Sequence, residues 1–155
     1  MLAVEPFYSD GLRFSCRQCS GCCRGAPGFV YLSRRDLESI CTFMKVSPEF
    51  FTERYCRWVP KGGVEVLSLI EKSNNDCIFW EAGKGCVIYP ARPFQCSSYP
   101  FWASVLSIGE KSWQALAEDC PGINCGRLHT REEIESVLEQ RKHNPYISRK
   151  TGGMN

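Results

Sequence analysis

Four cysteines within eight residues carry the clearest chemistry in this sequence. They follow the pattern Cys16-x2-Cys19-x2-Cys22-Cys23. A two-residue gap lets successive thiolates turn towards one metal ion or cluster. Core packing does not require so many sulfur atoms in so short a segment, and nearby glycines allow the backbone to approach a bound centre closely. We therefore predict that these four cysteines are metal ligands.

Further cysteines lie in the middle and towards the end of the chain. Cys77, Cys86 and Cys96 stand beside predicted turns or within a proline-rich stretch, and Cys120 begins a Cys-Pro-Gly sequence. Such positions suit metal ligands, whereas the alternative is a set of separate buried thiols. Cys125 follows as a weaker candidate. We predict that the metal ligands include Cys77, Cys86, Cys96 and Cys120.

Two further points concern the number of metal centres and the cysteines that are not expected to bind metal. Neighbouring side chains point in different directions, so Cys22 and Cys23 need not bind the same metal, and one or two centres are both open. Cys41 and Cys56 fall within predicted helices, Cys41 on the apolar face. We expect both of these thiols to be structural.

Bulk composition limits the class of protein. The chain has 155 residues and 11 cysteines, an odd number that excludes complete disulfide pairing within one chain. We find neither a signal peptide nor an apolar run long enough for a membrane span, so we expect a cytoplasmic protein with reduced thiols and no membrane partner. The net charge of +2 argues against a nucleic-acid partner. A partner protein is unknown.

Local sequence patterns predict an α+β fold. We expect a small, irregular, metal-stapled domain over residues 1–147 with short strands and about three to four helices, followed by a mobile tail over 148–155. Capping residues predict helices over 34–45, 48–58 and 131–142. The other expected elements are strands over 11–15, 64–70, 77–80 and 86–89, a short helix or turn around Cys96, and a hairpin formed by 101–106 and 111–116.

The ordered set of cysteine motifs resembles the CxxCxxCC cysteine-cluster family, the YkgJ-like zinc- or iron-chelating domain. The resemblance extends from Cys16 to Gly122. Besides the first cluster and Cys77, it rests on Cys86-Val87-Ile88-Tyr89-x2-Arg92-Pro93-x2-Cys96, Tyr99-Pro100 and Cys120-Pro121-Gly122. The resemblance implies these cluster cysteines: Cys16, Cys19, Cys22, Cys23, Cys77, Cys86, Cys96 and Cys120. It supplies no catalytic residue.

Thiolate ligands suit both zinc and iron, so ligand type alone does not choose the metal. The first three cysteines also match the start of a bacterial ferredoxin run, which with the family resemblance favours a 4Fe–4S cluster over zinc. Arg92 lies within the matched motif, and we expect it to support the bound centre. His129 and His143 lie outside the pattern, where a surface or capping role is expected.

These observations predict a metal-binding protein with a structural or electron-transfer role. One alternative is a zinc-stabilised interaction module for a protein partner. Another is a metal-dependent enzyme, such as an iron–sulfur oxidoreductase, or an accessory factor to a modification enzyme. The sequence contains no recognisable pair of nucleophile and base, phosphate loop or paired carboxylates, so it identifies no catalytic residues.

Overall fold

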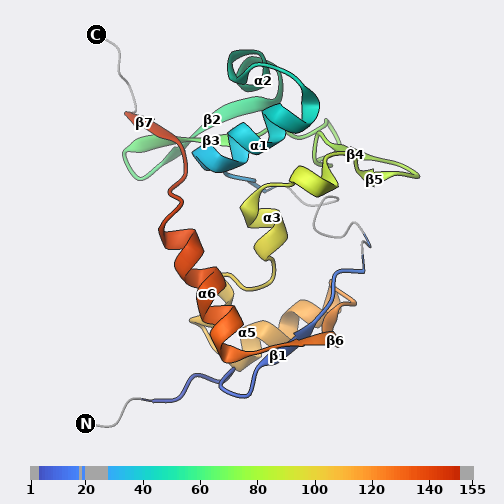
Figure 1. Cartoon of the computed structure of the whole chain (residues 1–155), viewed down its shortest axis with the longest axis vertical. Coiled ribbons are helices and arrows are strands. Elements are labelled where there is room, and N and C mark those ends of the chain that lie inside the picture. Colours follow the sequence, from blue (N-terminus) through green and yellow to red (C-terminus); the bar gives the residue numbers. More distant parts are fainter. Residues whose placement is uncertain (1–3, 18, 20–27, 151–155) are drawn as a thin grey trace. The chain divides into compact units, whose positions relative to one another are not determined.

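The computed structural model describes residues 4–17, 19 and 28–150 (Figure 1). The chain forms two compact units, and each combines two separate stretches of sequence. Unit 1 consists of Met1–Gly21 and Ser98–His143, and unit 2 consists of Cys22–Ser97 and Asn144–Asn155. The short helices and small antiparallel sheets confirm the predicted α+β class. The single domain expected over residues 1–147 stays a prediction.

Unit 2 is built on a three-stranded antiparallel sheet in the order β2-β3-β7. Strands β2 (Cys56–Lys61) and β3 (Val64–Leu69) form a hairpin that turns at Gly62 and Gly63, and β7 (Ser148–Lys150) pairs with the other edge of β3. Residues 148–150, the first part of the tail expected over 148–155, form β7 and extend this sheet. Residues 151–155 lie outside the described part of the chain, and the mobility of the tail stays a prediction.

Helices α1 (Arg34–Met44) and α2 (Pro48–Tyr55) begin where their capping residues predict. Ser33 and Asp36 form a complete capping box, and Lys45 ends α1 in the left-handed conformation with φ of 60°. Both helices contribute to the core of unit 2, whose buried members are Leu32, Leu37, Ile40, Cys41, Phe51, Leu67, Leu69, Phe79, Ile88 and Ala91.

The predicted extension of α2 to Trp58 is wrong. The helix ends at Tyr55, and Cys56 is the first residue of β2. Pro60 disfavours helical conformation in the residue before it, while β3 offers a continuous antiparallel partner from Cys56↔Leu69 to Lys61↔Val64. Pairing with β3 therefore outweighs the local helical pattern.

The rest of unit 2 holds the short elements that carry its candidate ligands. Strands β4 (Trp80–Glu81) and β5 (Gly85–Cys86) form a small hairpin, followed by the 3-10 helix η1 (Tyr89–Ala91) and α3 (Phe94–Ser98). Of the strands predicted over 77–80 and 86–89, only Trp80 and Cys86 lie in the observed hairpin. The hairpin is short because its turn brings Glu81 opposite Gly85, and η1 begins at Tyr89.

Unit 1 pairs β1 (Leu12–Phe14) with β6 (Ile123–His129). It also contains α4 (Ala103–Leu106), α5 (Glu110–Ala115), the 3-10 helix η2 (Leu116–Glu118) and α6 (Arg131–Lys142). The capping box of Thr130 and Glu133 places the start of α6 as predicted. Residues from all these helices except η2 join Phe14 in the core of this unit, which includes Phe101, Val105, Leu106, Trp113, Ile123 and Ile134.

The hairpin predicted for residues 101–116 is wrong, because α4 and α5 occupy that segment. Short apolar runs fit either a strand or a helix, and tertiary packing decides between them. Here Trp113 is fully buried from α5, and its ring stacks on Phe101 at 5.7 Å between centroids. Gly109, at φ of 124°, precedes α5 rather than forming a strand turn.

Within the described residues, none of the helices is long and apolar enough to cross a membrane.

Candidate metal centre

In unit 1, the backbone before Cys16 packs tightly against the loop that begins at Cys120. A Cβ atom placed on Gly122 would lie 2.2 Å from the carbonyl oxygen of Ser15, and one on Gly126 would lie 2.1 Å from the Ser15 Oγ. Only glycine permits approaches this close. The two glycines therefore hold residues 120–126 against the residue that immediately precedes Cys16.

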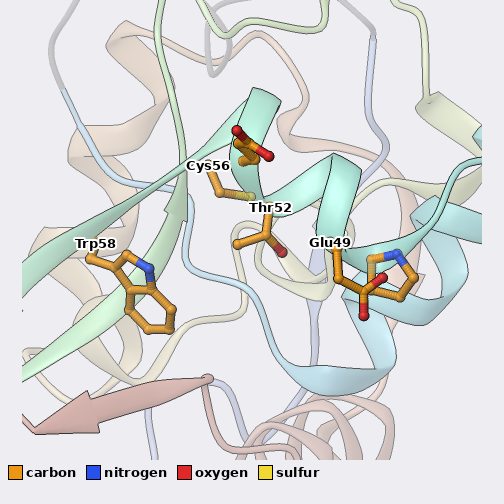
Figure 2. Close-up of a pocket in the computed structure, with 6 residues that line it drawn as sticks. Glu49, Thr52, Cys56 and Trp58 are labelled. Atoms are coloured by element: carbon orange, nitrogen blue, oxygen red, sulfur yellow. The ribbon is translucent and has the colours of Figure 1, made fainter.

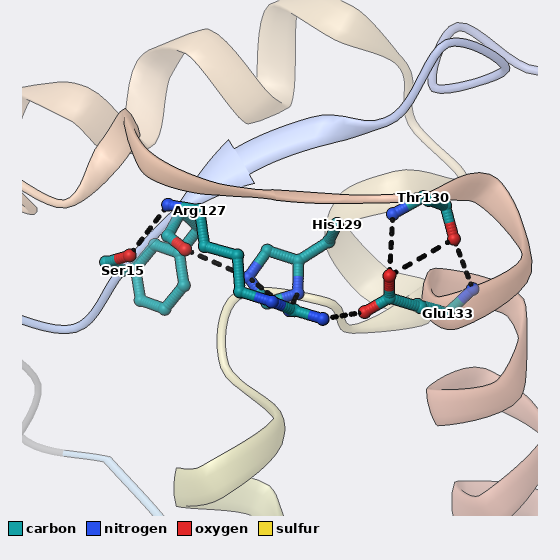
Figure 3. Close-up of polar contacts among 6 residues, drawn as sticks. Ser15, Arg127, His129, Thr130 and Glu133 are labelled. Atoms are coloured by element: carbon teal, nitrogen blue, oxygen red, sulfur yellow. Dashed lines mark hydrogen bonds and ion pairs between the residues drawn. The ribbon is translucent and has the colours of Figure 1, made fainter.

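The pairing of β1 with β6 reinforces this contact. Arg13 pairs with Leu128, yet the next residue, Phe14, pairs with Ile123, so several residues of β6 bulge away from β1. The backbone N–H of Arg127 within the bulge donates to Ser15 Oγ at 2.9 Å (Figure 3). The bulge thus holds Ser15, the residue immediately before Cys16, through Arg127 and the close contact of Gly126.

A polar network lies beside this junction in unit 1. His129 Nε2 lies 2.9 Å from the carbonyl oxygen of Phe14, and Arg127 bonds both His129 Nδ1 and the carboxylate of Glu133 (Figure 3). The hydrogen bond from Arg127 is the main cause that lowers the pKa of Glu133. His129 therefore positions β6 against β1. His143 is the C-cap of α6, and its ring lies 3.2 Å from Glu139.

The thiols of unit 1 differ in exposure. Cys16 and Cys19 are exposed, whereas Cys120 is half-buried against the core of the unit and its N–H donates to Leu116 O at 2.9 Å. Cys125 is also half-buried and lies in the bulge, where its N–H donates to Gly122 O at 3.2 Å. Cys120 therefore follows a fixed helical turn and leads directly into the Gly122 contact.

In unit 2, one hairpin carries both Cys77 and Cys86. Trp80 links them, because its N–H donates to Cys77 O at 2.9 Å and its Cα pairs with that of Cys86. Both cysteines are half-buried beside the core of this unit. The hairpin therefore holds these two predicted ligands on neighbouring backbone.

Cys96 lies in α3, and its neighbour Gln95 ties that helix to the segment that follows the first cysteine cluster. Gln95 Oε1 accepts from the N–H of Tyr31 at 3.0 Å, and Gln95 Nε2 donates to Phe29 O at 2.7 Å. One side chain thus satisfies two backbone groups, as an adjacent strand would. The chain beyond Gly28 is fixed beside the helix that carries Cys96.

Asp36 attaches α3 to α1. Its carboxylate accepts from the N–H of Ser33 and from the N–H of Phe94, each at 2.9 Å, and Asp36 is buried. We expect Asp36→Ala to lower the free energy of unfolding by about 2–4 kcal/mol, because it removes a capping group and leaves partly buried N–H groups without an acceptor. Urea denaturation would measure this loss. Glu38→Ala, at an exposed position of the same helix, should change stability by less than about 0.5 kcal/mol.

Arg92, predicted to support the metal, contacts its own local backbone. Its guanidinium donates to Tyr89 O at 2.9 Å and lies 3.8 Å from the centroid of the Tyr89 ring. These contacts fix the turn between Cys86 and Cys96. A role towards the bound metal stays a prediction.

The two cysteines expected to be structural lie in the core region of unit 2. Cys41 is buried, and Cys56 is half-buried. Burial raises the pKa of the Cys56 thiol to about 12, with a further contribution from Cys41. Burial and the charge of Glu49 also raise the pKa of Cys41. Both thiols therefore stay protonated at neutral pH, whereas metal ligation requires thiolates.

The chemistry of the donor set fits zinc or iron, because the candidate ligands are all thiols. Cys22 and Cys23 lie outside the described residues. Among the residues that are described, no group of three or more Cys, His, Asp or Glu side chains lies close enough together to bind a metal ion. The structure instead fixes the backbone around candidate ligands at separate positions within each unit.

The family comparison covers the same cysteines. The model of the CxxCxxCC family, described as "Putative zinc- or iron-chelating domain", matches residues 15–121. The chain belongs to the CxxCxxCC family. The match begins at Ser15 and ends at Pro121, so both of its ends fall at the Ser15–Gly122 junction. Cys125 lies beyond it. Comparison with solved structures finds no match for this member of the CxxCxxCC family.

Sequence reasoning missed the contacts through which Gly126, Gln95 and Asp36 position the candidate ligands. The only local sign of the β6 bulge is the glycine that follows Cys125. Gln95 is an ordinary helical residue, and its sequence position does not indicate its contacts with Phe29 and Tyr31. The capping role of Asp36 was evident, but its bond to Phe94 joins positions 58 residues apart. Such contacts depend on tertiary structure.

Proposed function

We propose that this CxxCxxCC protein binds an iron–sulfur cluster, with 4Fe–4S favoured and zinc as the alternative, in one or two centres. The proposed ligands are Cys16, Cys19, Cys22, Cys23, Cys77, Cys86, Cys96 and Cys120. The protein has a structural or electron-transfer role and acts in the cytoplasm. A bound iron–sulfur cluster supplies one-electron redox chemistry, whereas zinc held by four thiolates supplies structural cross-linking.

The contact of Gly122 with Ser15 is the main support for this proposal. It joins the backbone beside Cys16 to the backbone beside Cys120, two predicted ligands from opposite ends of the family match. A contact that tolerates no side chain at Gly122 is expected if the thiolates of Cys16 and Cys120 bind the same metal centre, because their backbones must then stay close together. The same reasoning gives Gln95 a role as the residue that fixes the chain next to Cys96.

The identity of the metal distinguishes the two roles. We expect protein purified without oxygen to be brown, to absorb near about 400 nm, and to contain iron and sulfide. Elemental analysis of iron and zinc together with a reductive titration would measure this. A colourless protein loaded with zinc and silent to reduction would exclude the iron–sulfur cluster and electron transfer, and would leave the structural role.

A further inference from the structure

Lys72 lies beside the hairpin that carries Cys77 and Cys86. It follows β3 in unit 2, and its backbone N–H donates to Asp76 O at 2.8 Å across the turn that leads to Cys77. Lys72 is half-buried, and its ammonium donates to Trp80 O in β4 at 2.5 Å. Trp80 is also the residue whose N–H donates to Cys77 O and whose Cα pairs with that of Cys86. The ammonium therefore binds the backbone that joins two predicted metal ligands.

The ammonium of Lys72 has no opposite charge within its own hairpin. The acidic residues of this segment are engaged elsewhere, in the pairs Glu71–Arg57 at 2.7 Å, Glu81–Lys84 at 3.4 Å and Asp76–Asn74 at 3.2 Å. Within the residues that the structure describes, no carboxylate forms an ion pair with Lys72. Partial burial removes hydration from the charge, and one carbonyl oxygen occupies one of its three donors. A half-buried positive charge is thus left without a counter-charge.

Exposed charges elsewhere in unit 2 do not have this significance. Glu49 is an example, because it lies beside an open pocket that Thr52 and Cys56 also line (Figure 2). The carboxylate of Glu49 is exposed, so water solvates it and it requires no opposite charge. Lys72 differs in being half-buried and in lying beside residues whose thiols are predicted to ionise when they bind metal.

The ammonium is close enough to act on a metal held by this hairpin. Backbone dimensions and the spacing of paired antiparallel strands place it within roughly 10 Å of the Cys86 Cα. This distance is about one Debye length at roughly 0.1 M salt, and partly buried charges are screened less than exposed ones. A metal held by four thiolates has a net negative charge. Such a centre would supply the counter-charge that the hairpin itself lacks.

We propose that Lys72 is a positioning residue that supplies the counter-charge for the metal–thiolate centre at Cys77 and Cys86. This inference rests on the proposed function, because it takes both cysteines as ligands. Lys72 is not a ligand itself, since a protonated ammonium has no lone pair to donate. Its hydrogen bond fixes Trp80 between the two ligands, and its positive charge offsets that of the thiolates.

Competition for zinc between the zinc-loaded full chain and a chromophoric chelator tests this proposal. Lys72→Met keeps an unbranched stem without the charge. It should weaken zinc binding about tenfold, the effect of one unit charge at about 10 Å in an effective dielectric of about 20. Lys72→Gln keeps a neutral hydrogen-bond donor and should weaken binding to a similar extent. Lys72→Arg keeps the charge and should remain within about threefold of the wild-type affinity.

Lys84→Met is the matched control on the same hairpin. Lys84 is exposed and pairs with Glu81, so the loss of its charge should leave zinc affinity unchanged. In protein that carries an iron–sulfur cluster, Lys72→Met should also make the midpoint potential more negative. The reason is that the ammonium stabilises the additional negative charge of the reduced cluster.

The variants separate the charge of Lys72 from its hydrogen bond and from the ligand assignment. Wild-type zinc affinity in Lys72→Met or in Lys72→Gln would overturn the proposal, as would failure of Lys72→Arg to restore binding. Loss of zinc in Cys86→Ser together with wild-type affinity in Lys72→Met would overturn the role of Lys72 alone. Undiminished zinc affinity in Cys86→Ser would overturn both the ligand assignment and this proposal.

Discussion

Cys19→Ser will lose metal and, with it, most of the stability that metal confers. Cys19 is exposed, so its thiol contributes little to packing. If Cys19 is a ligand, its replacement should lower metal affinity at least about tenfold and the free energy of unfolding of the loaded protein by about 3 kcal/mol or more, because binding energy of a structural metal is folding energy. Metal analysis and urea denaturation would measure both effects.

Cys41→Ser is the control, because it should lower the stability of the protein without loss of metal. Cys41 is 5% exposed and packs in the core of unit 2. A buried hydroxyl in its place should cost about 1–3 kcal/mol, with metal stoichiometry unchanged. After removal of metal by a chelator, Cys19→Ser and the wild-type protein should be equally stable. Full metal occupancy in Cys19→Ser would refute its assignment as a ligand.

Gly122→Ala should be among the most destabilising single methyl additions in unit 1. The new Cβ would lie 2.2 Å from the Ser15 carbonyl oxygen and 3.1 Å from the ring of Phe14. Because the nearer obstacle is backbone, the chain at Ser15 must move away from Gly122. We expect a loss of about 3 kcal/mol or more in the free energy of unfolding and reduced metal content.

Gly28→Ala provides the comparison for this substitution. Gly28 follows the first cysteine cluster, as Gly122 follows Cys120, but nothing lies within 4 Å of a Cβ placed there. Gly28→Ala should therefore change neither stability by more than about 0.5 kcal/mol nor metal content. Equal tolerance of alanine at both positions would show that the Ser15–Gly122 contact does not position the ligands.

Local capping chemistry made part of this fold predictable. Ser33, Ser47 and Thr130 each accept a hydrogen bond from a backbone N–H three residues later, and the three helices begin where these residues indicate. The ends were harder to predict, because α2 stops where pairing with β3 begins. Capping depends on a few neighbouring residues, whereas strand pairing depends on the whole unit.

The candidate site shows the same division. Cysteine spacing identified the family and the thiols to test, since spacing is a local property of the chain. The surroundings of those thiols could not be predicted, because Ser15 meets Gly122 and Gly126 through distant parts of the sequence. The error at residues 101–116 has the same origin, because the burial of Trp113 depends on partners such as Phe101 and Asn124.

The pairing of β1 with β6 sets an order of events during synthesis. Phe14 and His129 are in contact although they are 115 positions apart. The ribosome therefore releases the first cysteines long before the strand that holds their backbone, and unit 1 folds only after β6 has emerged. Throughout that interval Cys16 and Cys19 belong to a nascent chain without their final support. If Cys16 and Cys19 are metal ligands, stable loading of metal is a late, largely post-translational event in the life of this protein.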